Sequence, residues 1–160
     1  MWGPEMNGKD AIVTRLRSEE IDQVEPLVAD FVSSQNRLTF REDYWPKFRS
    51  WIACTLGDDA YLTFIARVDD HIAGIIVGRI EEQGPLLAPD KCGYVNMLVV
   101  RPDFRGRKIG TCLWEAARKW FSEQGVSEVQ LYTELGNTTS REFWNEIGFS
   151  VYLERRKKWI

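Results

Sequence analysis

The sequence predicts a mixed α/β fold, in which a mixed sheet of about six strands carries helices on both faces. The apolar patterns follow the order β-α-α-β-β-β-α-β-α-β. Residues 93–133 form a strand–helix–strand crossover, so its two strands should be parallel. The 160 residues, 44% of them hydrophobic, suffice for one core, so we expect a single domain over residues 1–160. Residues 1–10 are polar and contain glycine and proline, and they should form a flexible tail.

The first part of the chain reads as a strand followed by two helices. Apolar and polar residues alternate over 11–17, and Ser18 can then cap a helix. The apolar stripe of this helix contains Pro26, which should kink or divide it. Pro46 suits the first turn of a second, aromatic-rich helix that ends near Leu56.

The central elements are three strands and a helix. The expected strands cover residues 60–68, 71–80 and 93–101. The first two should form a hairpin around Asp69–Asp70, and the third is apolar enough to be buried on both faces. A helical stripe beginning at Ile109 ends at Gly125.

The last elements complete the crossover and close the sheet. A strand is expected over 126–133, and a capping box at Thr139–Glu142 should open a short helix that Gly148 closes. A final strand is expected over 149–159. Its basic run, Arg155–Lys158, is interpreted as a solvated strand edge that prevents sheet–sheet pairing.

Composition excludes several classes of function. Lys and Arg number 21 against 24 Asp and Glu, so the net charge of −3 provides no general attraction for nucleic acid or an anionic membrane. Cys54, Cys92 and Cys112 lack paired spacing and His71 is the one histidine, so we expect no metal and no disulfide framework. No apolar run is long enough for a membrane span and no signal region is visible, which favours a cytoplasmic protein.

The segment most suggestive of chemistry is the loop before the predicted helix at Ile109. It carries Arg105, Gly106, Arg107 and Lys108, so cations and glycine stand where a helix start exposes unpaired backbone N–H groups. That combination favours an anion site. The loop matches neither GxxxxGK[ST] nor GxGxxG. The alternative interpretation is a tight turn with a solvated basic face.

Two motifs resemble one family. Val100–Gly110 resembles the acetyl-CoA loop of the GNAT N-acetyltransferases, usually written Q/R-x-x-G-x-G/A. Asn137 followed by Phe143–Phe149 resembles the N…lY-x-x-x-GF signature of the same family, and the resemblance extends over residues 11–159. It implies a GNAT-like sheet, acetyl-CoA as co-substrate and a single acetyltransferase domain.

The resemblance also implies cofactor-binding residues. Leu98, Val99 and Val100 would pair with the pantetheine arm where the fourth and fifth strands splay apart, and the N–H of Leu98 would steady the thioester oxyanion. Asn137 and Trp144 would meet the cofactor near that arm. The pyrophosphate loop would comprise Arg105, Gly106, Arg107, Lys108, Ile109, Gly110 and Thr111.

Two residues depart from the family pattern. Lys108 replaces the first motif glycine and adds a cation, which is compatible with phosphate binding. Trp144 occupies the position of the tyrosine that usually protonates the thiolate, and an indole N–H cannot do so. Either the thiolate, with a pKa of about 8.5, leaves unassisted, or Tyr132 or Tyr94 supplies the proton.

The general base is a second open question. An amine of pKa about 10.4 is neutral in only roughly 1 molecule in 2,000 at pH 7, so its deprotonation needs help. Asn96 stands where many relatives carry Glu, and it can hold a water but cannot act as a base. Glu134, at the end of the fifth strand, is either the base or a solvated acid.

The resemblance predicts an N-acetyltransferase that acts directly on the primary amine of a small molecule or peptide. The losses at Trp144 and Asn96 leave a non-catalytic CoA-binding regulatory module as the alternative, and a cofactor-free interaction module as a third. The acceptor pocket should be built from loops 33–44 and 81–92, where Glu81, Glu82 and Asp90 would suit a cationic amine. Dimers are common in the family, and the resemblance leaves a homodimer open.

Overall fold

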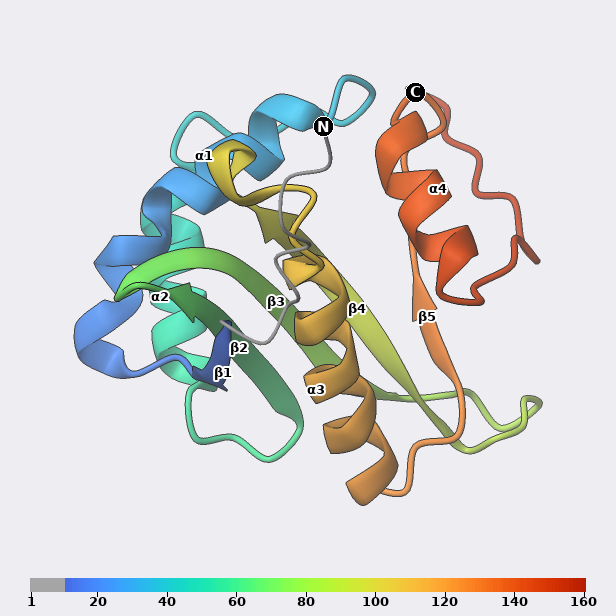
Figure 1. Cartoon of the computed structure of the whole chain (residues 1–160). Coiled ribbons are helices and arrows are strands. Elements are labelled where there is room, and N and C mark those ends of the chain that lie inside the picture. The colour runs from blue at the N-terminus through green and yellow to red at the C-terminus, as the bar shows by residue number, and fades with distance from the viewer. Residues whose placement is uncertain (1–10) are drawn as a thin grey trace, which may run out of the picture.

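The computed structural model describes residues 11–160, which form one five-stranded mixed sheet with helices on both faces (Figure 1). The strand order is β1-β2-β3-β4-β5. The strands are β1 (Ile12–Arg15), β2 (Tyr61–Val68), β3 (His71–Glu82), β4 (Lys91–Val100) and β5 (Val129–Leu131). The helices are α1 (Glu25–Ser34), α2 (Tyr44–Thr55), α3 (Ile109–Glu123) and α4 (Thr138–Glu146), with short 3-10 helices η2 (Ser18–Val24) and η3 (Pro102–Phe104). The predicted fold class is confirmed, and the tail expected at residues 1–10 lies outside the described residues.

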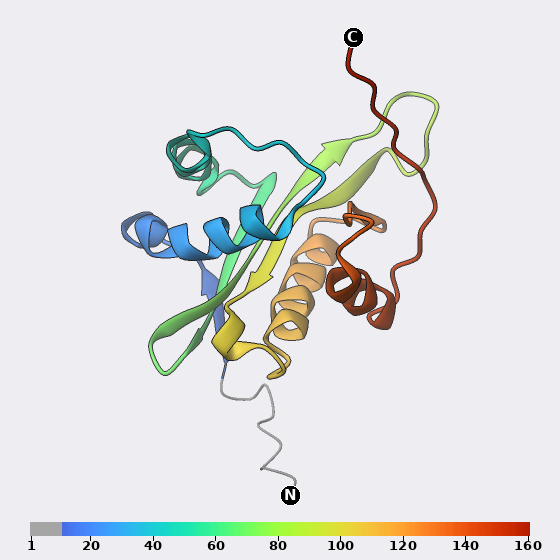
Figure 2. The ribbon, with the colours of Figure 1, turned by 90° about the horizontal axis from the view of Figure 1, so that it is seen from above.

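The sheet separates two apolar clusters. Figure 2 shows α1 and α2 on one face and α3 and α4 on the other. On the α3 face, Leu113 and Phe121 pack with strand residues such as Leu62 and Val95. On the α1 face, Leu27 and Ile52 pack with Ile75 and Met97. Because both faces are covered, the central strands are apolar on both sides, as the sequence predicts for β4.

Several local predictions are confirmed. Pro26 divides the first helical region, since η2 ends at Val24 and α1 begins at Glu25. Asp69 and Asp70 both have positive φ, 48° and 64°, as a tight hairpin turn requires.

The expected cap at Ser18 is wrong: Arg17 holds the N-cap position, and its backbone N–H and side chain both bind Glu20.

The strand expected over 149–159 is not formed. Residues 149–160 have no regular secondary structure, and Val151, Leu153 and Trp159 are largely exposed. The physical reason is the short partner and the local charge: β5 has three residues, and Arg155–Lys158 are four adjacent cations that favour water. The described sheet therefore has five strands where about six were predicted.

The crossover prediction is confirmed, because β4 and β5 pair in parallel. Their pairing stops early, with Val95 opposite Leu131 as the last pair, whereas β4 continues beside β3 to Val100. Past Val95, β4 therefore has a free edge toward β5, and the two strands diverge in Figure 1.

A β-bulge lies at the same point. Met97 pairs with Val77 and Val95 pairs with Gly78, so Asn96 is an extra residue on β4. The side-chain packing agrees, since Val95 belongs to the α3-face cluster and Met97 to the α1-face cluster, although two residues apart in a regular strand point to the same side.

The contact between Gly93 and Phe121 generates a stability prediction. A Cβ at Gly93 would lie 2.6 Å from Cε1 of Phe121, a ring that is only 1% exposed. Gly93→Ala should lower the free energy of unfolding by about 1–3 kcal/mol, because the ring that joins α3 to β4 must move. Gly84→Ala is the matched control, since a Cβ there meets no atom within 4 Å. Urea unfolding measures both variants, and equal midpoints would contradict the packing argument.

Candidate active site

The free edge of β4 presents backbone donors to the space between β4 and β5. The N–H of Arg101 donates to the carbonyl of Ala73 on the β3 side, at 2.8 Å. Because N–H groups alternate between the two edges of a strand, those of Leu98 and Val100 point to the open edge. At the other end of the strand, the N–H of Gly93 points toward β5 and donates to Glu128 O at 2.8 Å. Odd-numbered N–H groups therefore face β5 before the bulge and β3 after it, so the bulge exchanges the two edges.

The loop at the start of α3 places positive charge near this edge. Lys108 is the N-cap of α3 in the left-handed conformation, φ 58°, and no side chain caps the helix. Gly106 also has positive φ, 76°. Within residues 11–160, Arg105, Arg107 and Lys108 form no ion pair with a carboxylate. The loop thus combines uncapped helix N–H groups with three cations that lack carboxylate partners in that part of the chain.

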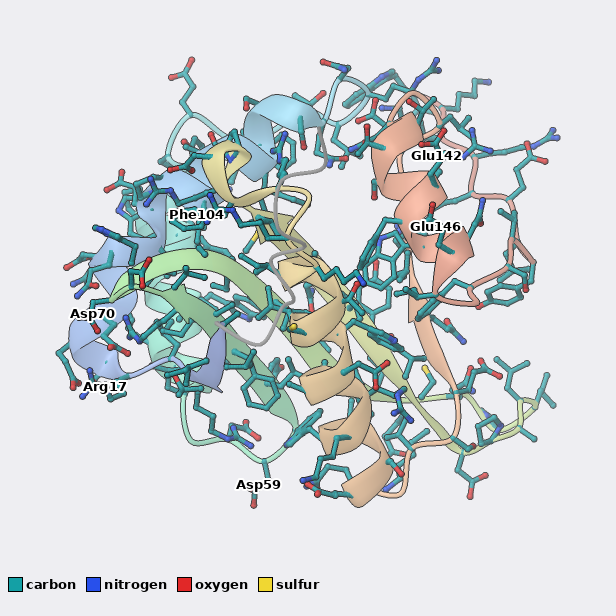
Figure 3. All side chains as sticks on the ribbon, viewed as in Figure 1. Arg17, Asp59, Asp70, Phe104, Glu142 and Glu146 are labelled. Atoms are coloured by element: carbon teal, nitrogen blue, oxygen red, sulfur yellow. The ribbon has the colours of Figure 1, made fainter. Side chains whose placement is uncertain are left out.

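Neighbouring contacts shape the loop. Nε of Arg105 donates to the carbonyl of Val100 at 3.1 Å, which ties the loop to the end of β4. The ring of Phe104, labelled in Figure 3, has two guanidinium groups near its centroid, that of Arg101 at 5.1 Å and that of Arg107 at 5.3 Å. Arg101 forms an ion pair with Asp103 at 2.8 Å, whereas Arg107 has no carboxylate partner among residues 11–160 and contributes its full positive charge to the loop.

Gly110 allows the two helices of this face to approach. A Cβ there would lie 3.2 Å from the ring of Phe143 on α4 and 3.6 Å from the side chain of Leu98. Phe143 therefore packs against the first turn of α3 at the base of the opening. Sequence reasoning treated it only as part of a motif, because its contact with Gly110 depends on how α3 and α4 pack.

Two polar side chains near the divergence have buried oxygens without partners. Oδ1 of Asn96 and both carboxylate oxygens of Glu134 are buried and find no hydrogen-bond partner in the described chain. Buried polar atoms are normally satisfied, so unpaired ones mark a place that a water or ligand completes. Glu134, the residue that the sequence offers as the base, and Asn96, which it offers as the holder of a water, are thus the ones that the structure leaves unsatisfied.

The two candidate acids are in edge-to-face contact. The rings of Tyr94 and Tyr132 are 5.6 Å apart and perpendicular in type, and the guanidinium of Arg79 lies 4.3 Å from the Tyr94 ring. Tyr132 is 62% exposed, with Arg155 at 5.0 Å from its ring. Burial, followed by the neighbouring Tyr132, raises the pKa of Tyr94 to about 12.

Asn137 and Trp144 occupy structural positions on α4. Oδ1 of Asn137 accepts a hydrogen bond from the Ser140 N–H at 3.0 Å, so Asn137 caps α4 and the predicted capping box at Thr139 is wrong. Trp144 is 7% exposed and packs against Trp114 and Phe149, at 5.8 and 5.1 Å. Its assignment to the cofactor site stays a prediction. Glu142 and Glu146 mark the exposed side of α4 in Figure 3.

Arg37 is a neighbour of the site that sequence reasoning did not single out. Its Nε lies 3.9 Å from the point where a Cβ on Gly136 would stand, and Oε1 of Glu134 lies 3.7 Å from the same point. Arg37 belongs to the loop between α1 and α2, almost one hundred residues from Glu134 in the chain. No local pattern signals this proximity, which depends on the packing of α1 over the sheet.

The family comparison agrees with this geometry. The model of the acetyltransferase (GNAT) family matches residues 25–149, and the chain belongs to that family. It is therefore an acyltransferase enzyme with the mixed sheet of that fold. Among the described residues, no group of three or more His, Cys, Asp or Glu side chains could hold a metal, and no helix has the length and apolar character to cross a membrane.

Two named relatives are similar to the chain in sequence, and a solved structure is similar to it in fold. It is 28% identical over 149 residues to an N-alpha-acetyltransferase of Sulfurisphaera tokodaii, covering 89% of this chain and 81% of that protein. It is 29% identical over 91 residues to N-alpha-acetyltransferase 30 of Schizosaccharomyces pombe, covering 56% of this chain but only 58% of that relative. The crystal structure of a predicted acetyltransferase with acetyl-CoA from Clostridium acetobutylicum superposes with a TM-score of 0.78 at 14% identity, covering 92% and 95% of the two chains.

The environment of Tyr94 predicts its titration. Because the folded protein holds the phenol proton more tightly than an unfolded chain, with pKa values of about 12 against about 10, stability should fall as the pH rises between these values. At about pH 11 the folded protein and Tyr94→Phe should therefore show equal phenolate absorbance, whereas in guanidinium the variant should lack one phenolate. A phenolate missing from the folded variant at that pH would show that Tyr94 titrates normally.

Proposed function

We propose that the chain transfers an acetyl group from acetyl-CoA directly to the primary amine of a peptide amino terminus. The observation that carries this proposal is the free edge of β4 beside the uncapped start of α3, with two unsatisfied polar side chains at the divergence. The N-alpha-acetyltransferases among its relatives support a peptide α-amine as acceptor. The same observation favours catalysis over a CoA-binding regulatory module, which would need no unsatisfied acceptor beside the cofactor.

The cofactor fits the geometry of the open edge. The N–H of Val100 would bind the pantetheine arm as an added strand, and that of Leu98 would face the thioester at its end. Val99, between them, is anchored to β3. The first-turn N–H groups of α3 and the charged loop would bind the pyrophosphate. A Cβ at Gly106 would meet no atom within 4 Å, which leaves room for close approach. The side-chain amide of Asn137 would donate to the arm, because its oxygen already caps α4.

The reaction needs three contributions from the chain. Glu134 takes the proton of the acceptor ammonium, and Asn96 holds the water or amine in place through its unpaired oxygen. The neutral amine nitrogen then bonds to the thioester carbon while the Leu98 N–H stabilises the developing oxyanion. The carbon–sulfur bond breaks, and the nitrogen releases its second proton to water as the amide forms.

The leaving group departs as a thiolate. A phenol with a pKa of about 12, as in Tyr94, is a weaker acid than a thiol of pKa about 8.5, so proton transfer from Tyr94 to the thiolate is unfavourable. Tyr132 is exposed, and Trp144 is buried away as part of an aromatic cluster. Unassisted departure, with solvent protonating the thiolate later, is consistent with all three environments.

Cofactor binding is tested by reversing one loop charge. Lys108→Glu should raise the dissociation constant for acetyl-CoA about tenfold or more, because a charge-assisted contact with phosphate becomes a repulsion. Lys119→Glu, on the same helix but at its far end beside Glu123, is the control and should change little. Isothermal titration measures both, and equal affinities would contradict the proposed pyrophosphate site.

The role of Glu134 is tested by turnover. Glu134→Gln should lower kcat for a peptide acceptor about 10²–10⁴-fold while acetyl-CoA affinity is unchanged, because the amide cannot accept the ammonium proton. Glu142→Gln, on the exposed side of α4, is the control. Release of CoA from acetyl-CoA is followed with peptides, polyamines and aminoglycosides. Binding without turnover on any amine would refute the proposed transfer, and an unchanged kcat would remove Glu134 from it.

A further inference from the structure

Three cations gather beyond the end of β5, from two distant parts of the chain. Nζ of Lys157 donates to the carbonyl of Arg37 at 2.9 Å, although 120 residues separate them. The guanidinium of Arg155 stands 5.0 Å from the ring of Tyr132, one residue past the end of β5. The segment that the sequence predicted as a final strand thus bridges β5 and the loop between α1 and α2.

These three charges have no carboxylate partner in residues 11–160. Their neighbours differ in this respect, since Arg156 binds Glu154 at 2.9 Å and Arg79 binds Glu81 through its Nε at 2.7 Å. The acidic stretch that the sequence offered for a cationic acceptor is therefore partly neutralised, because Glu81 already has a cation.

One of these cations, Arg37, borders Glu134, and the other two lie near it through Tyr132 and the Arg37 carbonyl. Arg37 Nε and Glu134 Oε1 lie 3.9 and 3.7 Å from one point above Gly136, yet they make no hydrogen bond or ion pair. Tyr132 precedes Glu134 by two residues, so Arg155 lies along the same short segment. A buried carboxylate without a partner thus stands next to a positive rim that does not neutralise it.

Resting on the proposed function, we infer that the preferred acceptor is an acidic amino terminus, a peptide with Asp or Glu at its first or second position. The α-ammonium reaches Glu134, and the acidic side chain binds the rim of Arg37, Arg155 and Lys157. An extended peptide advances about 3.3–3.6 Å per residue, so a carboxylate on either residue lies within reach of a rim that borders Glu134. Arginine binds a carboxylate through two hydrogen bonds, and a lysine-bearing terminus is repelled.

The test compares peptides identical except at the first two residues, which are Asp-Glu, Ser-Ser or Lys-Lys. We expect kcat/KM for the acidic peptide to exceed that for the lysine peptide roughly tenfold or more, since three exposed charge contacts together approach that factor. The preference should shrink as sodium chloride rises from about 0.05 to 0.5 M, because exposed charges are screened.

Reversing the charges of the rim tests whether these residues cause the preference for the acidic peptide. Arg155→Glu combined with Lys157→Glu should abolish or invert the ratio between acidic and lysine peptides, while the Ser-Ser peptide changes little. Arg156→Glu, a single reversal between the two sites on a side chain held by Glu154, is the control, and Arg155→Glu alone gives the variant of equal charge change. Thermal melts with acetyl-CoA confirm that each variant is folded and binds the co-substrate.

The outcomes separate the two proposals. Equal rates on the three peptides, or a ratio that the reversal leaves intact, would overturn the acidic preference and leave the transferase function standing. No turnover on any peptide, with acetyl-CoA bound, would overturn both. A preference for the lysine peptide would show that the acidic loop between β3 and β4 selects the acceptor.

Discussion

The divergence of β4 from β5 is the constraint on which the site depends. Parallel pairing ends at Val95 and Leu131, and the bulge at Asn96 reverses which backbone groups face the opening. Without the bulge, the N–H of Leu98 would point back into the sheet and bind β3. One extra residue in one strand thus turns an ordinary crossover into an edge that can accept an extended ligand.

Packing on the α3 face holds this opening in place. Phe121 fills the space above Gly93, and Phe143 fills the space above Gly110, so α3 is fixed to β4 on one side and to α4 on the other. The charged loop lies between β4 and α3 in the chain, and both of these elements are fixed by that packing. Its position relative to the free edge is therefore set by these apolar contacts and by the hydrogen bond from Arg105 to the Val100 carbonyl.

Most of the architecture follows from periodicity in the sequence, because the stripes of α3 and the apolar run of β4 are long and unambiguous. The loop at Arg105–Gly110 is predicted by a different pattern, cations and glycines directly before a helix start. The last strand was predicted wrongly, since its alternation says nothing about whether a neighbour exists to pair with it. The proximity of Arg37 to Glu134 is invisible to any local pattern, because it is created by tertiary packing across almost one hundred residues.

The contact between Gly93 and Phe121 couples the residue types that these two positions can accept. A side chain at 93 forces the ring at 121 to move or to be replaced by a smaller residue, and a smaller residue beside Gly93 would leave a void between α3 and the sheet. Among divergent copies of this chain, substitutions at the two positions should therefore arise together or not at all. Because Phe121 lies on α3, this coupling also limits the substitutions by which α3 could shift relative to the sheet.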